Sequence, residues 1–549
     1  MTIRNSLFYI ILGFAILNLL LRIDGTMLWD EDEAAYAAFA NRMLQTHDWL
    51  DISYFNAFGM HRKPPLHFWL IATGYRVFGV HEWVVRLPAL LATLSTYLVM
   101  WIWGKRLFGK AVAEWSVMIL SVSILVPTLG KISVLDAEML FYETLAVFAL
   151  RSVFLFPAER QHVFVFWLAV ALGVLLKGPP ILILTGGMFV FLYFLHPDKK
   201  YLLLLKSWIG LPLALAPLLV WAYASWQHDG GVLVSFLWDW YVMKRVGGSN
   251  AVNVTWTGPP GYHFVVLLVC FLWVIPYLFP ALADLYQRFK LRESNALFFV
   301  AWLLFGWVFY EMVRSKLPAY SIAAQPALAI LIAQQMVKHQ SNIPNYLYKQ
   351  WIRNTAIFQL LFVLILATAI GYFAMTVFGP DGFRASMPVI TVCWAFALCS
   401  TIFYYANKPF AAQATAVAGG AMFMLSVWVM LMPLIEHSRD ATRRAVQTAL
   451  KLAGGRTKNL IINANPGANL PSIYFYGEQN GFAVSSGGEN GVRADEVMRS
   501  TTPTVFITDS INAAPLLPIL AEKGLKTTEI RVFLIDRNRK SSYYVFTNF

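Results

Sequence analysis

The stretch Leu-Trp-Asp-Glu-Asp-Glu-Ala-Ala-Tyr, residues 28–36, follows directly on an apolar run at residues 7–23. It places four consecutive carboxylates, Asp30 to Glu33, beside a segment that is long enough to enter a lipid bilayer. Charged side chains at membrane depth are costly, and those that occur there usually serve a function. The stretch therefore predicts a membrane protein with a functional site next to its first span.

A helix terminus explains part of this acidic run. Asp30 and Glu33 have the spacing of a capping pair, in which both side chains accept from backbone amides. Asp32 remains as the candidate for chemistry, and it shares a helical face with Tyr36. The alternative is that Asp32 is a solvated carboxylate at the start of an amphipathic surface helix.

The composition is that of a polytopic membrane protein. Of the 549 residues, 58% are hydrophobic and 13% are charged, whereas soluble proteins have about 25% charged residues. The apolar run at residues 7–21 is long for a signal peptide and has no small-residue cleavage site after it, so we interpret it as a retained anchor. The net charge of +13 fits basic loops and lipid phosphates better than nucleic acid. All three cysteines lie in apolar runs, which predicts neither disulfides nor a cysteine metal site.

Apolar runs predict about thirteen membrane spans. Two alternatives remain for the region 162–195: a helical hairpin, or a single span plus a re-entrant piece. They lie near 7–23, 84–103, 111–129, 137–155, 162–176, 179–195, 207–226, 262–283, 295–312, 318–337, 354–378, 387–405 and 411–435.

Basic residues flank alternate spans, which predicts a cytoplasmic N-terminus by the positive-inside rule. The candidate site residues then all lie on the opposite, extracytoplasmic face of the membrane. We expect a transmembrane domain at 1–440, with a catalytic outer loop at about 24–83, and an extracytoplasmic α/β domain at 455–549. Its predicted strands lie at 460–462, 472–476, 505–508, 531–535 and 543–546, with helices at 491–499 and 513–523. A lid, an acceptor-docking role and a structural role all remain open for it.

Asp136 is the second candidate acid, because it opens the apolar span in Ser133-Val134-Leu135-Asp136. Aspartate is favoured at helix N-caps, so capping is the alternative. Two acids that converge on one face of a membrane protein are more typical of a paired catalytic site. Glu33, Tyr36 and Tyr54 are expected to line the substrate site.

Three lysines lie one or two residues before a proline at the end of a predicted span: Lys63, Lys177 and Lys316. Interfacial lysines often extend to lipid headgroups, which is the simpler explanation for each one alone. Together they form a positive rim on the outer face, where the positive-inside rule predicts few basic residues. Phosphate is the counter-ion that suits such a rim. The other members of the rim are Arg62, Lys244, Arg245 and Arg314.

The histidines of the first outer loop do not have the spacing of a metal site. His47, His61, His67 and His81 are scattered, whereas zinc needs three or four ligands in tight geometry. We therefore expect no required cofactor; a divalent metal is possible but is not indicated.

At these residues the chain resembles the GT-C glycosyltransferases of the aminoarabinose transferase and protein mannosyltransferase group, over essentially its whole length. The most specific motifs are D-E-x-x-Y and K-L-P-x-Y. The matching segments are Asp32-Glu33-Ala34-Ala35-Tyr36, Asp48-Trp49, Lys63-Pro64-Pro65, Leu135-Asp136, Lys177-Gly178 and Ser315-Lys316-Leu317-Pro318-Ala319-Tyr320.

The resemblance implies an inverting transfer of a sugar from a polyprenyl-phosphate donor to a lipid, glycan or protein acceptor at the outer face of the inner membrane. It implies that Asp32 and Asp136 are catalytic, that Lys63 contacts the phosphate and that Tyr320 lines the lipid-phosphate cavity. One departure is Arg62, which stands where the aminoarabinose transferases have a glutamate. This leaves the sugar and the acceptor, including lipid A, open.

The chemistry fits the residues independently of the resemblance. A phosphate leaving group needs basic side chains to neutralise it, and a hydroxyl acceptor needs a positioned carboxylate. The alternative is a transporter or flippase of a lipid-linked sugar, in which the two acids relay protons or bind a cation. Transporters place such groups near the bilayer midplane, often within repeats. Here the acids lie at span ends and no repeat is visible, which favours an enzyme.

Overall fold

The computed structural model describes residues 3–24, 26–29, 32–52, 62–243, 258–313, 315–341, 348–463, 471–486, 502–534 and 539–549. The chain divides into two compact units. Unit 1 is Met1–Ile23, Lys63–His67 and Arg86–Leu431, and unit 2 is Asp24–Arg62, Phe68–Val85 and Met432–Phe549. Most of the predicted outer loop 24–83 thus groups with the C-terminal part, whereas Lys63–His67 belongs to unit 1.

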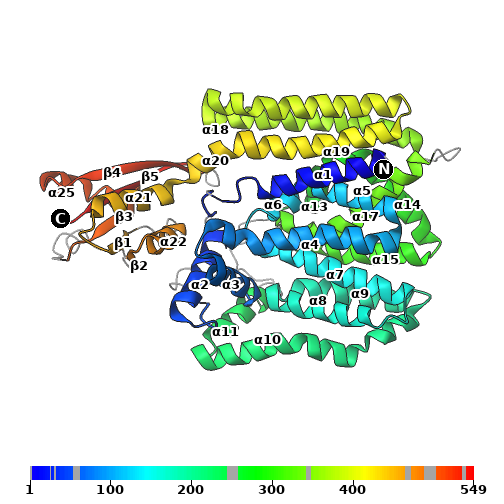
Figure 1. Cartoon of the computed structure of the whole chain (residues 1–549), viewed down its shortest axis with the longest axis horizontal. Coiled ribbons are helices and arrows are strands. Elements are labelled where there is room, and N and C mark those ends of the chain that lie inside the picture. Colours follow the sequence, from blue (N-terminus) through cyan, green and yellow to red (C-terminus); the bar gives the residue numbers. More distant parts are fainter. Residues whose placement is uncertain are drawn as a thin grey trace. The chain divides into compact units, whose positions relative to one another are not determined.

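The chain is mostly helical, as expected for a polytopic membrane protein (Figure 1). The helical elements up to residue 312 are α1 (Ile3–Leu20), α2 (Asp32–Thr46), α3 (Leu66–Phe78), α4 (Glu82–Phe108), α5 (Lys110–Ser121), α6 (Leu125–Leu129), α7 (Leu135–Leu155), α8 (Gln161–Lys177), α9 (Pro179–Leu195), η2 (Lys199–Leu205), α10 (Ser207–Asp229), α11 (Val232–Trp238), η3 (Asp239–Met243), α13 (Tyr262–Cys270), η4 (Leu272–Val274), α14 (Ile275–Lys290), α15 (Ser294–Leu303), η5 (Leu304–Val308) and α16 (Phe309–Met312).

The helical elements that follow are η6 (Pro318–Ala324), α17 (Gln325–Gln340), α18 (Lys349–Tyr405), α19 (Pro409–Ser426), η7 (Val427–Leu431), α20 (Met432–Arg439), α21 (Ala441–Ala453), α22 (Pro471–Gln479), α24 (Ser510–Ala513) and α25 (Leu517–Glu522). The strands are β1 (Asn459–Asn463), β2 (Ala483–Ser486), β3 (Val505–Asp509), β4 (Thr527–Leu534) and β5 (Arg539–Thr547).

Within the described part of the chain, seven helices are long and apolar enough to cross a membrane, or eight if the bent pair at 262–290 counts as one span. The thirteen expected spans are therefore not confirmed. Helix α7 is absent from this set, and it carries four ionisable residues, Asp136, Glu138, Glu143 and Arg151. The sequence prediction counted α7 as a span because it considered the length of the apolar run and not the charged residues within it.

One expected span is interrupted for a local reason. The predicted span 111–129 ends at Ser121, where the hydroxyls of Ser121 and Ser123 donate hydrogen bonds to the carbonyl oxygens of Met118 and Leu120, respectively. Side-chain bonds of this kind compete with the helix ladder. The region 162–195 forms two helices, α8 and α9, that meet at Gly178, whose φ is +80°. A left-handed backbone there suits glycine and ends α8.

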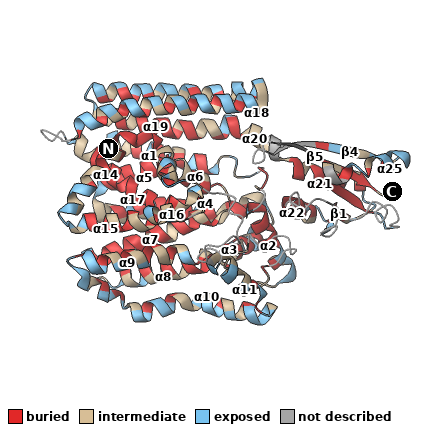
Figure 2. Cartoon of the chain, turned by 180° about the vertical axis from the view of Figure 1, so that it is seen from behind, coloured by how far each residue is buried: buried red, intermediate tan, exposed pale blue. Residues whose placement is uncertain are grey.

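Unit 1 is built around buried helices. In the most apolar stretch of the segment 318–340, which includes α17, 83% of the residues are buried. In the corresponding stretch of α18, only 22% are buried. Figure 2 shows this difference, with α17 largely red and α18 largely pale blue on its outer face. Trp115, Trp273 and Trp302 are the largest fully buried side chains of this unit. Helix α18 breaks at Gly379, whose φ is 66°, immediately before Pro380; proline disfavours a helical residue in front of it.

Unit 2 contains a five-stranded sheet of order β2-β1-β3-β5-β4. Strands β2, β1 and β3 pair in parallel, whereas β5 runs antiparallel to both β3 and β4. One core cluster contains Phe506, Leu516, Leu520 and Phe546, and the rings of Phe506 and Phe546 stack with centroids 5.2 Å apart. The small C-terminal α/β fold expected from the sequence is thus present.

Several details of this α/β fold differ from the prediction. Residues 472–476 form part of helix α22 and not a strand. Every residue from Pro471 to Gly477 is buried. A helical segment that is buried on all sides has no polar face, so its sequence is a short apolar run that cannot be told from a buried strand. Strand β2 was not predicted. The expected helix at 513–523 is two short pieces, α24 and α25, and the one at 491–499 lies outside the described residues.

Candidate functional site

Asp136 and Lys177 form a half-buried ion pair in unit 1. Asp136 lies in the first turn of α7, Lys177 is the last residue of α8, and these two helices pack against each other. The Lys177 Nζ donates to Asp136 Oδ1 at 2.7 Å, and the two side chains are 20% and 21% exposed. The N-cap position of α7 is Val134 and not Asp136. The capping alternative for Asp136 is therefore wrong, and its carboxylate instead fixes an ammonium group.

Three further polar side chains surround this pair. Glu143 and Tyr320 lie near Lys177, and Tyr310 lies near Asp136 and Glu143. The rings of Tyr310 and Tyr320 are 5.6 Å apart. We call Asp136, Glu143, Lys177, Tyr310 and Tyr320 the Asp136 cluster. It places one basic side chain among two acids and two phenols in unit 1.

Two members of the Asp136 cluster were not predicted. Glu143 is buried and lies seven residues after Asp136 on α7, so that two helical turns place both acids on one face. This spacing was a usable signal in the sequence. Tyr310 precedes the K-L-P-x-Y motif and belongs to the cluster because its ring packs against that of Tyr320. No periodic pattern in the sequence indicates this contact.

Lys63 is held by a tyrosine that the sequence analysis did not single out. Its Nζ donates a hydrogen bond to Tyr241 Oη and lies 4.7 Å from the centroid of the Tyr241 ring. Tyr241 belongs to η3, a π-helical turn. An aromatic face attracts an ammonium group without cancelling its charge. The hydroxyl and ring of Tyr241 therefore define the position of the Lys63 ammonium group.

Lys316 has a structural environment. It is 3% exposed, its Nζ donates to the carbonyl oxygens of Tyr310 and Glu311 at 3.1 Å and 2.5 Å, and it lies 3.6 Å from the Glu311 carboxylate. A cation at these carbonyls stabilises the end of α16. The geometry therefore favours a structural role, and contact of Lys316 with a donor phosphate stays a prediction.

Removing this buried cation should destabilise the protein. We expect Lys316→Met to lower the free energy of unfolding by about 3–5 kcal/mol, because the Glu311 carboxylate and the end of α16 lose their cation. Lys338→Met is the matched control, since Lys338 is 40% exposed in its pair with Asp284, and exposed pairs contribute about 0–1 kcal/mol. Thermal unfolding of the purified proteins in one detergent measures both. Equal midpoints for the two variants would contradict this assignment.

Asp32 is the exposed first residue of α2 in unit 2. Tyr36 Oη donates to Asp32 Oδ1 at 3.0 Å, so the prediction that they share a helical face is confirmed. Glu33 is 2% exposed, and its Oε2 accepts the Trp29 amide at 2.8 Å. Glu33 thus reaches back to the chain before α2, as a capping acid does. This burial favours a structural role for Glu33, and its predicted contact with substrate remains untested.

The C-terminal part of unit 2 contacts the Asp32 segment. Tyr476 Oη of α22 accepts the Leu28 amide at 2.9 Å, and Asn41 of α2 donates to Glu478 at 3.3 Å. Tyr476 also donates to Glu82 at 3.3 Å. Helix α22 therefore holds the segment that leads into α2. This contact favours a structural role for the C-terminal part among the three left open by the sequence.

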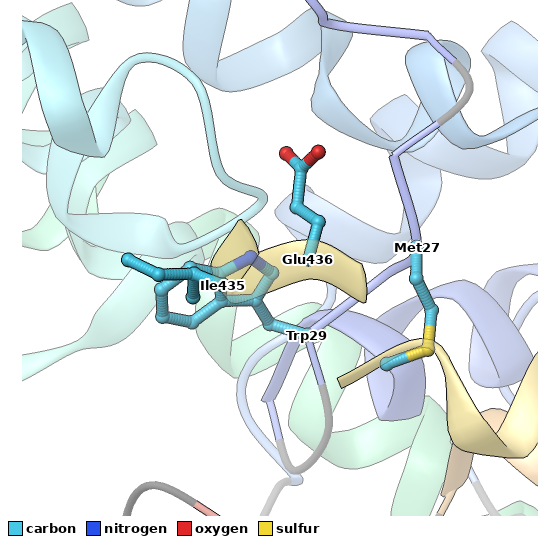
Figure 3. Close-up of a pocket in the computed structure, with 4 residues that line it drawn as sticks. All are labelled: Met27, Trp29, Ile435 and Glu436. Atoms are coloured by element: carbon cyan, nitrogen blue, oxygen red, sulfur yellow. The ribbon is translucent and has the colours of Figure 1, made fainter. Parts of the chain in front are cut away.

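A small pocket lies in unit 2 beside the same segment. Met27, Trp29, Ile435 and Glu436 line it (Figure 3). Its lining contains a carboxylate and apolar side chains but no basic group, so it does not suit a phosphate.

The structure thus brings Asp136, Lys177 and Tyr320 together in unit 1, and Asp32 and Tyr36 together in unit 2. Arg62 is half-buried in unit 2. Tyr54, Lys244, Arg245 and Arg314 lie outside the described residues, so their predicted roles stay predictions. Among the described residues, no group of three or more His, Cys, Asp and Glu side chains could hold a metal ion.

Residues 62–226 match the family model described as dolichyl-phosphate-mannose-protein mannosyltransferase. The match covers Lys63, Asp136 and Lys177. It does not reach Asp32 or the K-L-P-x-Y motif.

Curated relatives match a larger part of the chain. An uncharacterized protein of Aquifex aeolicus is 28% identical over 62% of this chain and 64% of its own length. The undecaprenyl phosphate-alpha-4-amino-4-deoxy-L-arabinose arabinosyl transferase 1 of Pseudomonas fluorescens is 27% identical over 61% of this chain and 60% of its own length. The corresponding transferase of Shewanella sediminis is 25% identical over 71% and 70%. The chain therefore spans less than two thirds of the length of the first two relatives.

Solved structures match the fold over the whole chain. ArnT from Cupriavidus metallidurans in the apo state superposes with a TM-score of 0.72 at 18% identity, covering 100% of this chain and 99% of that one. The same protein bound to undecaprenyl phosphate gives 0.71 at 18% identity, covering 98% of each chain. The chain is thus a multi-pass helical membrane protein whose fold is similar to that of ArnT, and whose sequence is similar to the aminoarabinosyl transferases and, over residues 62–226, to the protein mannosyltransferase model.

Proposed function

We propose that this protein is a glycosyltransferase that moves a sugar from a polyprenyl-phosphate donor to an acceptor, with inversion at the anomeric carbon. The observation that carries the proposal is the half-buried Asp136–Lys177 pair at the ends of two helices, in a chain with the fold of an undecaprenyl-phosphate-binding protein. The names of the aminoarabinosyl transferases among its relatives support a donor of this class.

The basic residues serve the leaving group in this proposal. Breaking the bond between the anomeric carbon and the phosphate leaves negative charge on the polyprenyl phosphate. Lys63, which is held at Tyr241, and Lys177, which is held at Asp136, each bring a fixed cation to that charge. Fixed charges stabilise a transition state without reorganising during the reaction. Arg62, Lys244 and Arg245 are further candidates for this role.

The acids serve the acceptor. Asp32 is exposed at the start of α2, and the Tyr36 hydroxyl orients its carboxylate. Such a carboxylate can take the proton of an acceptor hydroxyl as that oxygen attacks the sugar. A single displacement of this kind inverts the anomeric centre. Asp136 acts in the proposal by holding Lys177, with Tyr320 lining the lipid-phosphate cavity.

The sugar and the acceptor are proposed only as classes. The acceptor is a hydroxyl or phosphate group of a lipid such as lipid A, of a glycan or of a protein. Arg62 places a cation where the aminoarabinose transferases have a glutamate, so the sugar is not assigned from the relatives.

The direct test is to incubate the purified protein with polyprenyl-phosphate sugars and to measure release of polyprenyl phosphate. We expect release that depends on an added acceptor. A transporter or flippase of lipid-linked sugars would move the intact donor across a vesicle membrane and release none, which would replace this proposal.

We also propose that the protein lies in a bacterial inner membrane with a cytoplasmic N-terminus and a periplasmic C-terminal part. A reporter that is active only outside the cytoplasm should be active when fused after Phe549. It should be inactive when inserted at 284–293, which comprises the end of α14 and the link to α15 and contains Arg288, Lys290 and Arg292. The reverse pattern would invert the topology and place the site residues on the wrong face.

A further inference from the structure

A fully buried histidine contacts both sides of the turn that carries Asp136. His67, at the start of α3, is 0% exposed and belongs to unit 1. Its Nδ1 lies 2.7 Å from Glu138 Oε1, and its Nε2 lies 3.1 Å from Ser133 Oγ. Glu138 and Ser133 are 2% and 0% exposed. Buried polar groups persist only where they are hydrogen-bonded, so this arrangement is specific.

The partners of His67 bracket Asp136 in the sequence. Ser133 precedes Asp136 by three residues and lies before α7, whereas Glu138 follows it in the first turn of that helix. One imidazole ring therefore joins the extended segment before α7 to the helix itself. The Asp136 side chain, which remains 21% exposed, is carried between these two fixed points.

The turn is anchored at its other end by a buried lysine. Lys131 is 3% exposed, its Nζ donates to the carbonyl oxygens of Asn18 and Leu21 at the end of α1, and it lies 4.0 Å from the ring centroid of Trp428. The segment 131–138 is thus held at both ends. A rigid mounting of this kind is what a catalytic side chain needs in order to keep its geometry.

We infer that His67 is a positioning residue, which fixes Asp136 through its hydrogen bonds to Ser133 and Glu138. In the tautomer with the proton on Nδ1, Nδ1–H donates a hydrogen bond to the Glu138 carboxylate and Nε2 accepts one from the Ser133 hydroxyl. His67 also follows Lys63 by four residues, through Pro64 and Pro65, whose rings restrict the backbone. The same ring therefore ties the phosphate-binding segment to the acid that holds Lys177. This inference rests on the proposed glycosyl transfer.

Turnover should separate positioning from simple stabilisation. We expect His67→Ala to lower kcat by about 10–100-fold, because a displacement of about 1 Å in a site can cost that much. The KM for the polyprenyl-phosphate sugar should change little, since Lys63 keeps its contact with Tyr241. Glu138→Gln should retain most of kcat with an unchanged pH profile, because its amide oxygen still accepts from Nδ1–H. A large loss or a shifted profile in Glu138→Gln would show that the charge of Glu138 matters, and would overturn a purely positioning role.

His339→Ala is the matched control. His339 Nδ1 forms a hydrogen bond of 2.7 Å with Tyr277 Oη in the same unit. Loss of this hydrogen bond should lower the midpoint of thermal unfolding without a selective loss of kcat. If His67→Ala does not fold, Ser133→Ala replaces it, because it removes only one hydrogen bond of the ring. A normal kcat in Ser133→Ala and in every folded variant at His67 would contradict the inference.

Hydrogen–deuterium exchange gives a readout that needs no activity. The peptide that spans 131–138 should exchange faster in His67→Ala than in the unmodified protein, with little change in peptides of α17. If the unmodified protein released no polyprenyl phosphate, the proposed function would fail, yet this measurement would still decide whether His67 holds the turn. If the protein is active and exchange at 131–138 is unchanged in His67→Ala, the positioning role is wrong.

Discussion

Replacing Asp32 with asparagine is expected to reduce turnover by about 10²–10⁴-fold, the contribution of a general base. Asparagine keeps the size of the side chain and can still accept the hydrogen bond that Tyr36 donates to Oδ1 at 3.0 Å. It removes only the basicity that an attacking hydroxyl needs. Binding of undecaprenyl phosphate should survive, because the cations assigned to the phosphate are untouched. Turnover with a hydroxyl acceptor and the dissociation constant of undecaprenyl phosphate are the two measurements.

Asp51→Asn is the control for Asp32→Asn. Asp51 pairs with Arg42 at 2.9 Å on the surface of unit 2, and exposed pairs of this kind contribute about 0–1 kcal/mol. Its loss should leave turnover unchanged. Near-normal turnover of Asp32→Asn with a hydroxyl acceptor would show that another carboxylate is the base. Full activity with a phosphate acceptor alone would show that no base is needed.

The second large effect is expected at Asp136. Asp136→Asn should lower kcat by about 10²-fold, because Lys177 loses the carboxylate that holds its Nζ at 2.7 Å and a small displacement of a catalytic group is costly. Lys177→Met should be impaired as well, through loss of the cation itself. If Asp136 acts through Lys177, the double variant should be little worse than Lys177→Met. A double-mutant cycle on kcat measures this coupling, which for contacting residues is about 0.5–3 kcal/mol.

The outcome of this cycle distinguishes two roles for Asp136. Strictly additive losses would mean that Asp136 acts on the substrate independently of Lys177, as a second base would. A donor KM that rises in Lys177→Met but not in Asp136→Asn would place Lys177 alone at the phosphate. Asp284→Asn is the control, since it breaks the pair of Asp284 with Lys338 and should not affect kcat.

Local patterns in the sequence predicted what depends on neighbouring residues. The spacing of Asp32 and Tyr36 predicted a shared helical face, and the two form a hydrogen bond. The alternation of β-type runs and turns predicted β1, β3 and β5. Helical and strand periods repeat every few residues, so a short window contains the whole signal.

Short stretches of sequence gave wrong predictions where a segment is buried on all sides and its apolar residues therefore show no period. Residues 472–476 look like a strand because their side chains are aromatic, apolar or small, yet they lie in the buried part of helix α22. The thirteen expected spans were not confirmed, because apolar length alone cannot show where a helix breaks, as at Ser121 and between Cys270 and Leu272.

By itself the sequence determined the class of protein, the apolar helical unit, the small α/β fold and the acids and bases to consider. Only the tertiary structure decided which of these residues meet. It paired Asp136 with Lys177, buried Lys316 and Glu33 in structural contacts, and placed Tyr241 at Lys63. His67 and Glu138 are 71 positions apart in the chain, and no period links them. Such contacts arise because buried polar groups must find hydrogen-bond partners wherever packing brings them together, and that requirement acts only in the folded chain.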